Sequence, residues 1–378
     1  MGAAFLAALR YAAGQASALR GAGAAVVLAG MSPILRRLRT AMPAEFLAAL
    51  VLGLVFAVVL VLDQKYWWQL KPEYMFGWLV PFFVAFVVMD RWPKILAALR
   101  PTGESPLPAA ARRFAALGFG VAMTLGALFF LLGALYRAGA GVTQPGSLAM
   151  AIGFAGLLLG MLYFNAPAGR LGEGPVPTGW AAIRADARLM LVAQFVFPAL
   201  IWMISAPLVD AVENQLSLFL LRKVVTVVSF SFNTLGYPLV QEGSTLLLPN
   251  DQRVGVEDAC SGIRSLTACL FTGTFLAAVF LDRWWKKILL IGAALVLAVV
   301  TNLMRSVFLT AWAYHYGSDS IGGEFHDATG YAVLGLTFVG LLCLLPLFNT
   351  ENWVRWLTPK GEKPAAAAED GAAGTEKK

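Results

Sequence analysis

In "VEDACSGIRSLTACLF", residues 256–271, a cysteine stands just before a long apolar run. Asp258 precedes Cys260 by two residues, and Arg264 follows it by four. Residues 262–281 are predominantly apolar, and about 20 such residues suffice to cross a bilayer. The stretch therefore puts a carboxylate, a thiol and a guanidinium where the chain enters a membrane.

The composition of the whole chain agrees with a membrane protein. Of its 378 residues, 59% are hydrophobic and only 13% are charged, and the mean hydropathy is +0.71. Soluble globular proteins are usually about half apolar and about a quarter charged. An apolar excess of this size requires lipid as the solvent. We therefore expect an all-α polytopic membrane protein.

Apolar stretches long enough to cross a bilayer recur along the chain. Aromatic anchors typical of the membrane surface stand at some of their ends, such as Trp67–Trp68 and Trp284–Trp285. The pattern predicts about eight transmembrane helices, at roughly residues 44–62, 74–89, 114–136, 146–165, 188–207, 262–281, 287–312 and 328–348.

The distribution of basic residues predicts the orientation. Five arginines precede the first span, and Lys or Arg residues recur in every second loop, at residues 91–113, 170–188 and 283–287. The intervening loops hold few basic residues. Because basic loops stay cytoplasmic, both termini are expected inside and residues 208–260 outside. The same bias accounts for the net charge of +7, and no alternation of basic and aromatic residues suggests nucleic-acid binding.

The expected outer segment has two parts. Residues 208–235 have helix-like apolar spacing and could lie along the membrane surface. Residues 236–256 hold short β-favourable runs broken by Glu-Gly and Pro-Asn-Asp, which predicts a small extracytoplasmic β-hairpin before Cys260. At the ends of the chain, residues 1–42 are expected to form a cytoplasmic or interfacial extension, and the low-complexity residues 351–378 a disordered cytoplasmic tail.

Three polar residues that are far apart in the chain are predicted to meet at the outer side of the membrane. Cys260 stands at the outer end of the sixth span, Arg305 near the outer end of the seventh, and His326 at the entrance of the eighth. A helix N-terminus favours the thiolate form of a cysteine. A neighbouring histidine can move a proton, and a buried arginine can stabilise an oxyanion. The three residues therefore suggest a Cys–His–Arg acyl-transfer site.

Each of these residues also has an ordinary structural explanation. A cysteine beside glycine usually serves packing, and a histidine at a membrane surface is more often an anchor than a catalyst. Arg305 could pair with Asn302 one turn away. Arg264 lies one turn after the cysteine, where it could donate to the oxyanion, favour the thiolate, or pair with Glu257 or Asp258. The residues alone support catalysis and structure about equally.

No metal or organic cofactor is expected. The chain has three cysteines and two histidines, with no C-x-x-C or H-E-x-x-H spacing. Cys269 and Cys343 fall inside apolar runs, where a thiol acts as a small hydrophobe. The odd number of cysteines argues against a disulfide framework.

The motifs around the three polar residues resemble those of the exosortase/archaeosortase family of membrane cysteine transpeptidases. The segment "VEDACSGIRSL" is similar to the family's nucleophile motif, with Cys260 in the nucleophile's place. "NLMRSVFL" resembles its N-x-x-R helix, with Arg305 as the arginine. "FHDATGYAV" resembles its histidine motif, with His326 in the catalytic position. The resemblance spans roughly residues 45–348 and is most specific over 234–335.

The resemblance implies a substrate class and the role of each residue. Members of the family are held to act on secreted proteins whose C-terminal sorting signal has a short motif often built around Pro-Glu-Pro, a transmembrane helix and an Arg-rich tail. Cys260 would be the nucleophile that holds the product as a thioester, His326 the general acid/base, and Arg305 the stabiliser of the oxyanion. The product would pass to an acceptor amine or a sugar-linked carrier, such as an exopolysaccharide or a lipid-linked acceptor, or be released by water.

The same resemblance implies the organisation of the chain and its location. Residues 43–350 would form an exosortase-like transmembrane domain in a bacterial inner membrane, with the catalytic motifs at 256–331 facing outward. Arg264, Asn302 and Asp258 are candidate helpers.

Two other functions stay open from the sequence. A transporter or channel subunit would carry charged residues near the middle of the bilayer, where Arg305 is the one deep candidate. A non-catalytic membrane scaffold linked to polysaccharide export would keep the fold and tolerate Cys260→Ala.

Overall fold

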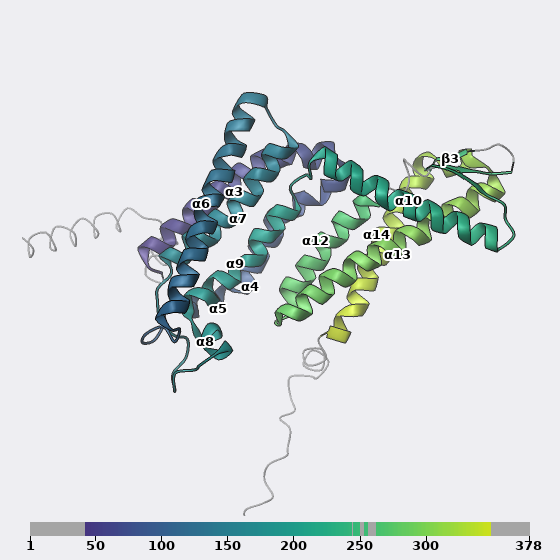
Figure 1. Ribbon diagram of the computed structural model, residues 1–378. Coiled ribbons are helices and arrows are strands. Elements are labelled where there is room, and N and C mark those ends of the chain that lie inside the picture. Colours follow the sequence, from purple (N-terminus) through teal and green to yellow (C-terminus); the bar gives the residue numbers. More distant parts are fainter. Residues whose placement is uncertain (1–41, 244, 250–252, 256–261, 349–378) are drawn as a thin grey trace, which may run out of the picture. The chain divides into compact units, whose positions relative to one another are not determined.

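The computed structural model describes residues 42–348 apart from 244, 250–252 and 256–261. Over these residues the protein is almost entirely helical (Figure 1). Nine helices of the described chain are long and apolar enough to cross a membrane, which confirms the predicted all-α polytopic membrane protein. The helices are α3 (Ala44–Leu70), η1 (Pro72–Leu79), α4 (Val80–Asp90), α5 (Trp92–Ala98), α6 (Ala109–Ala140), α7 (Gln144–Asn165), α8 (Trp180–Ala185), α9 (Ala187–Ile204), α10 (Asp210–Thr234), α12 (Ile263–Phe280), α13 (Trp284–Tyr316), η2 (Ser318–Ile321) and α14 (Gly323–Phe348).

The described chain forms two compact units. The first unit holds residues 42–67 and 77–207, and the second unit holds residues 68–76 and 208–348 outside the gaps given above. The predicted catalytic motifs fall in the second unit. Most of the predicted N-terminal extension, the predicted tail, Asp258 and Cys260 lie outside the described residues.

In the first unit, α6 and α7 pack backbone against backbone at glycines. A Cβ added to Gly153 of α7 would stand 2.4 Å from the backbone N of Phe130 and 2.6 Å from the backbone O of Gly126. A Cβ added to Gly126 would likewise stand 2.7 Å from the backbone O of Gly153. Small residues that let backbones touch are the usual means of packing in lipid, because lipid tails leave no hydrophobic force between helices.

Buried polar side chains of the first unit also join its helices. Ser205 Oγ, after α9, donates to Gln64 Oε1 of α3 at 2.8 Å. Arg137 of α6 pairs with Asp63 of α3, whose side chain is 1% exposed. Polar groups that cannot reach water must find partners inside the protein, so these contacts favour one arrangement of the helices.

In the second unit, α12, α13 and α14 lie side by side (Figure 1). Near the turn between α12 and α13, their apolar core includes Leu276, Leu290 and Leu341, one from each helix. Further along, Thr301 of α13 and Thr337 of α14 share a hydroxyl–hydroxyl hydrogen bond of 2.9 Å, with both residues buried. The three helices therefore form one packed group.

The helices of this group differ in length. α12 has 18 residues and α13 has 33. At about 1.5 Å per residue they measure about 27 Å and about 50 Å, against a hydrocarbon thickness of about 30 Å. α13 therefore extends well past the level at which α12 begins.

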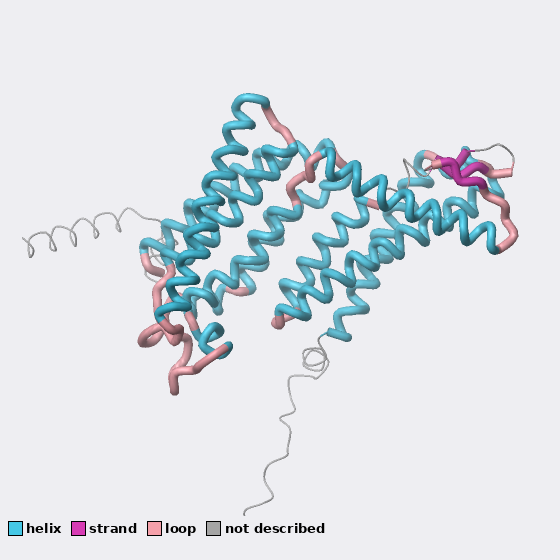
Figure 2. The backbone as a smooth tube through the Cα atoms, in the orientation of Figure 1, coloured by secondary structure: helices cyan, strands magenta, loops and turns pink. Residues whose placement is uncertain are grey.

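The extended part of α13 packs against α10 and a small sheet. Their common core includes Val228 and Phe232 of α10, Leu246 of the sheet, and Leu309 and Ala313 of α13. The sheet, drawn in magenta in Figure 2, is an antiparallel meander of three strands: β1 (Val240–Glu242), β2 (Thr245–Leu247) and β3 (Arg253–Gly255).

The sheet has one strand more than the hairpin predicted for residues 236–256. Glu-Gly ends β1 and begins the connection to β2, and Pro-Asn-Asp stands in the sequence between β2 and β3. Each of these turn sequences reverses the chain, so two of them produce three strands.

α10 is the helix that raises the number of candidate spans from about eight to nine. Residues 208–235 are predicted to be a helix along the membrane surface, and a helix is what the structure shows there. Its length and hydropathy also qualify it as a span. However, Arg222 and Lys223 stand exposed near its middle, which is a costly place for charge in a bilayer.

A short segment, residues 68–76, makes polar contacts with both α10 and α12. Lys71 Nζ lies 3.1 Å from Glu213 Oε2 of α10. Thr267 Oγ1 of α12 donates to the backbone O of Glu73 at 2.8 Å. The first turns of both helices are therefore held by the same segment.

We predict that Gly153→Ala destabilises the protein, because the added methyl group would collide with the backbone of α6. Overpacking of this kind typically costs about 1–3 kcal/mol of the free energy of unfolding. Gly118→Ala is the matched control, because a Cβ there meets no heavy atom within 4 Å and alanine favours a helix. Thermal unfolding in detergent should show a lower midpoint for Gly153→Ala and an unchanged or higher one for Gly118→Ala. Equal midpoints in the two variants would contradict the backbone contact.

Candidate functional site

Arg305 and His326 meet between α13 and α14. Arg305 Nη2 lies 2.7 Å from His326 Nε2 and 3.1 Å from the backbone O of the same residue. Arg305 belongs to α13, and His326 to the first turn of α14. Both side chains are partly buried. The structure thus brings together two of the three residues that the sequence analysis predicts to meet.

The contact with Arg305 fixes which nitrogen of a neutral His326 carries the proton. A guanidinium can only donate hydrogen bonds, so Nε2 accepts with its lone pair. In the neutral ring the proton is then on Nδ1, which lies 3.5 Å from Asp327 Oδ1. The Asp327 carboxylate is 65% exposed, so its attraction for the ring is largely screened by solvent. His326 therefore presents Nε2 as its basic nitrogen, facing Arg305.

Thr329 ties the pair to α14. Its Oγ1 donates to the backbone O of His326 at 2.8 Å and accepts from Arg305 Nε at 3.4 Å. The sequence analysis does not single out Thr329. Its signal in the sequence is the spacing H-x-x-T, which puts the hydroxyl one helical turn after the histidine.

α12 begins against Asn302 of α13. Gly262, which precedes α12, has a φ of +69°, a left-handed conformation that favours glycine. A Cβ added to Gly262 would stand 2.9 Å from Asn302 Nδ2 and 3.3 Å from Asn302 Cγ. Asn302 is 4% exposed and lies one turn before Arg305. The start of α12 is therefore held at the level of Asn302, close to the Arg305–His326 pair.

The remaining predicted residues differ in where they lie. Arg264 is exposed in the first turn of α12. Asn302 is buried against Gly262. Cys260 and Asp258 are outside the described residues, and the catalytic role of each predicted residue stays a prediction.

Aromatic side chains flank the Arg305–His326 pair. The ring of Phe325, next to His326 in the chain, has its centroid 6.2 Å from that of Phe308 and 5.1 Å from that of Trp312. Both partners belong to α13 and follow Arg305 toward the end of that helix. The rings therefore provide an apolar wall beside the polar pair.

No group of three or more His, Cys, Asp or Glu side chains that could hold a metal ion occurs among the residues that the structure describes. The polar atoms brought together are instead a guanidinium, an imidazole and hydroxyl or amide groups. This set can stabilise negative charge and transfer protons.

Comparisons with known proteins place the chain in a family. A family model described as transmembrane exosortase (Exosortase_EpsH) matches residues 67–343, well over half of the chain. A search of curated proteins and a search of solved structures found no match. The matched region contains the Arg305–His326 pair and the start of α12, within a multi-pass membrane protein. The chain therefore belongs to the transmembrane exosortase family.

Proposed function

We propose that this protein is a membrane cysteine transpeptidase that cleaves the C-terminal sorting signals of secreted proteins through a thioester on Cys260. Membership of the family supports a membrane sorting transpeptidase in general. The observation that carries the finer proposal is the contact of Arg305 with His326 close to the start of α12. An arginine, a histidine and a cysteine at one place have the chemistry of acyl transfer.

Covalent geometry limits how far Cys260 can be from this pair. Two residues of extended chain span at most about 7 Å, so the Cα atom of Cys260 lies within about 7 Å of that of Gly262. Gly262 contacts Asn302, and Arg305 is three residues further along α13, or about 4.5 Å along its axis. The thiol of Cys260 can therefore reach the space beside Arg305 and His326.

The proposed reaction has two steps. In the first, His326 takes the thiol proton and the Cys260 sulfur attacks the carbonyl carbon of the scissile peptide bond. Arg305 stabilises the oxyanion that forms, and His326 returns the proton to the leaving nitrogen as the C–N bond breaks. In the second step, an amine, a hydroxyl or water attacks the thioester and gives a proton to His326. The C–S bond then breaks, the sulfur leaves and recovers that proton.

These roles require the contact between Arg305 and His326 to change during the reaction. The lone pair of His326 Nε2 is occupied by Arg305 Nη2, so it cannot accept the thiol proton at the same time. We infer that substrate binding draws the guanidinium toward the scissile carbonyl oxygen, where the oxyanion will form, and frees Nε2. The bond from Arg305 Nε to Thr329 can keep the guanidinium nearby during this exchange.

The site is proposed to face the outside of a bacterial cytoplasmic membrane. With α10 along the membrane surface, as Arg222 and Lys223 favour, eight candidate spans remain in the described part of the chain, an even number that agrees with the proposal of two cytoplasmic termini. A ninth crossing by α10 would move the start of α12 to the cytoplasmic side, away from substrates that have already crossed the membrane. The proposed topology therefore depends on the position of α10.

The proposed substrates are secreted proteins that end in a short motif, a transmembrane helix and an Arg-rich tail. The helix of such a substrate would lie in the bilayer beside the enzyme, with its motif just outside. α13 extends past the start of α12, which puts Arg305 near the membrane surface, where that motif would be. The acceptor is proposed to be an amine or a sugar-linked carrier, with water as the alternative.

We predict that cleavage of a sorting-signal reporter requires Cys260 and His326. The reporter is a secreted protein with a Pro-Glu-Pro-type motif, a transmembrane helix, an Arg-rich tail and a C-terminal tag, co-expressed with the enzyme. Loss of the tag on a blot should occur with the wild type and not with Cys260→Ala or His326→Ala. The matched control is His315→Ala, because His315 is exposed near the end of α13 and should keep wild-type cleavage. Equal processing by the wild type, Cys260→Ala and His326→Ala would favour the non-catalytic scaffold.

We predict that Arg305→Lys abolishes most of the activity although it keeps the positive charge. An ammonium cannot reach the imidazole nitrogen, the backbone oxygen and Thr329 together as the guanidinium fork does. Removal of one oxyanion donor typically lowers kcat about 100- to 1,000-fold, and the rate of tag loss should fall by a similar factor. Arg222→Lys on the exposed face of α10 is the control and should cleave at the wild-type rate. A wild-type rate in Arg305→Lys, at equal amounts of enzyme, would rule out the proposed oxyanion role.

A further inference from the structure

The side chain of Thr329 contributes one hydroxyl group to the contact between α13 and α14. A hydroxyl has one proton to donate and two lone pairs that can accept. The Thr329 hydroxyl donates its proton to the backbone O of His326 at 2.8 Å and accepts from Arg305 Nε at 3.4 Å. Because a guanidinium can only donate, the direction of both hydrogen bonds is fixed. The hydroxyl therefore connects the guanidinium of Arg305 to the backbone of His326.

The guanidinium of Arg305 lies against one turn of α14. Its Nη2 is 2.7 Å from His326 Nε2 and 3.1 Å from His326 O. A Cβ added to Gly330 would stand 3.5 Å from the same nitrogen. The guanidinium is a rigid planar group, so contacts at both Nη2 and Nε define its plane as well as its position. The contact at Nε is the one that Thr329 provides.

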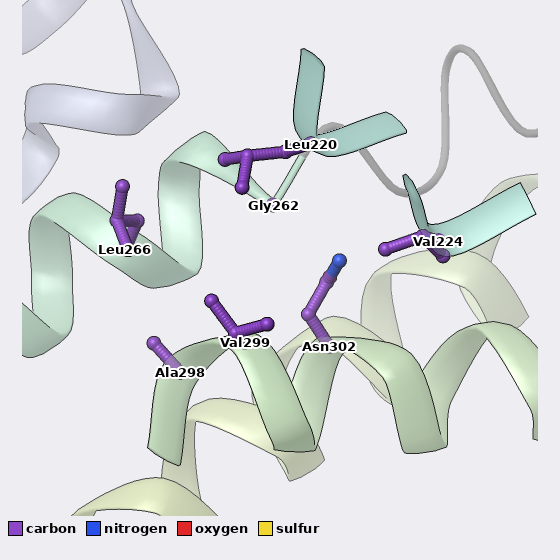
Figure 3. A pocket seen from close by; sticks show the side chains of 7 residues that line it. All are labelled: Leu220, Val224, Gly262, Leu266, Ala298, Val299 and Asn302. Atoms are coloured by element: carbon purple, nitrogen blue, oxygen red, sulfur yellow. The ribbon is translucent and has the colours of Figure 1, made fainter. Parts of the chain in front are cut away.

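Asn302, one turn before Arg305 on α13, faces the start of α12. Figure 3 shows its amide pointing toward the space between Gly262 and Val224. A Cβ added to Gly262 would stand 2.9 Å from Asn302 Nδ2. The amide of Asn302 therefore serves the start of α12, whereas the hydroxyl of Thr329 serves the guanidinium.

The proposed reaction breaks one contact of the guanidinium and can keep the other. Arg305 Nη2 must leave His326 Nε2 before the imidazole can accept a proton. The hydrogen bond to Thr329 is made by Nε, so it is not the bond that has to break. Its length of 3.4 Å exceeds the usual N–H···O range of about 2.7–3.2 Å, so it restrains the guanidinium without locking it. Without this restraint the long, flexible arginine side chain would have more rotamers available to it.

We propose that Thr329 is a positioning residue, whose hydroxyl keeps the guanidinium of Arg305 beside His326 while Nη2 leaves the imidazole for the scissile carbonyl oxygen. This role rests on the proposed function, because it concerns the exchange that the proposed reaction requires. Thr329 acts through Arg305 and is assigned no contact with the substrate. Loss of the hydroxyl should therefore slow turnover and leave KM unchanged.

The kinetic test removes the hydroxyl and keeps the shape of the side chain. Purified enzyme in detergent cleaves the sorting-signal reporter at a series of reporter concentrations. Thr329→Val should lower kcat about tenfold or more, the usual contribution of a hydrogen bond to a charged group, and Thr329→Ser should restore most of the rate. Thr226→Val is the matched control, because Thr226 is exposed on α10 and its hydroxyl also donates to a backbone O, that of Arg222, at 2.8 Å.

Four results of the kinetic test would overturn the proposal. These are a wild-type kcat in Thr329→Val, equal losses in Thr329→Val and Thr329→Ser, the same loss in Thr226→Val, and a change in KM alone. If thermal unfolding shows that Thr329→Val does not fold, Thr329→Ala takes its place. It removes the same hydroxyl, and alanine favours a helix.

A second measurement does not depend on turnover, because the chain has only two histidines, His315 and His326. In a His315→Ala protein purified without a histidine tag, histidine labelled with nitrogen-15 reports on His326 alone. The ring nitrogen chemical shifts at alkaline pH show which nitrogen carries the proton. With Thr329 present the proton should be on Nδ1, because Arg305 occupies Nε2. Thr329→Val should add the form with the proton on Nε2, and Thr329→Ser should not. Identical spectra with and without the Thr329 hydroxyl would overturn the proposal.

The two measurements separate a failure of this role from a failure of the proposed function. Equal processing of the reporter by the wild type and Cys260→Ala would refute the cysteine mechanism, and the nitrogen spectra would still test whether Thr329 holds the guanidinium. Processing that requires Cys260, together with a wild-type kcat in Thr329→Val, would uphold the proposed function and refute the role of Thr329.

Discussion

The close approach of Gly262 to Asn302 is the constraint on which the second unit's site depends. A Cβ at position 262 would press against the side chain of Asn302, and the left-handed backbone there also favours glycine. The contact fixes the level along α13 at which α12 begins. Arg305 lies one turn further along α13, so the start of α12 lies close to it. The position of α12 relative to Arg305 thus depends on one glycine and one buried amide.

α14 is held at the same level by hydroxyl groups. Thr301 and Thr337 share a buried hydrogen bond between α13 and α14, and Thr329 bonds both to Arg305 and to the backbone of His326. In lipid, such bonds and the fit of small residues replace the hydrophobic force that packs soluble helices. The first unit uses the same means, with glycines between α6 and α7. In the proposed mechanism, the hydrogen bond between Arg305 and His326 is also the one that substrate binding must break.

The sequence predicts the membrane helices and the meeting of Arg305 with His326, but few of the contacts that hold them. Helices that cross a bilayer need long apolar runs, so composition alone locates them. The end of one span and the start of the next share a side of the membrane, so Arg305 and His326 could be predicted to meet. The conformation of Gly262 could not be predicted, because a glycine two residues after a cysteine carries no sequence signal for a particular backbone conformation. The hydrogen bonds of Thr329 to Arg305 and His326 could not be predicted either, because threonine hydroxyls in helices make several kinds of hydrogen bond.

Two features of the second unit, α10 and the small sheet, could not be assigned fully from the sequence pattern. α10 has the length and hydropathy of a span, yet Arg222 and Lys223 stand near its middle. Amphipathic helices at a surface and spans with buried charges share this pattern, so sequence alone does not separate them. The three-stranded sheet was predicted in part, because both turn sequences indicate reversals of the chain but only a two-stranded hairpin was expected. Both features lie in the segment between α9 and α12.

The proposed mechanism requires the thiol of Cys260 to lie beside the Arg305–His326 pair. The most direct test uses a protein with Cys269→Ala and Cys343→Ala, which leaves Cys260 as its one thiol. A second cysteine is introduced as His326→Cys or, as a control on the same helix, Leu336→Cys. The measurement is the fluorescence of a short bifunctional thiol reagent that fluoresces only after it joins two cysteines. We expect the reagent to join Cys260 to the cysteine at position 326 and not to the one at 336, which is about 15 Å further along α14. No joining at 326, or equal joining at both positions, would contradict it.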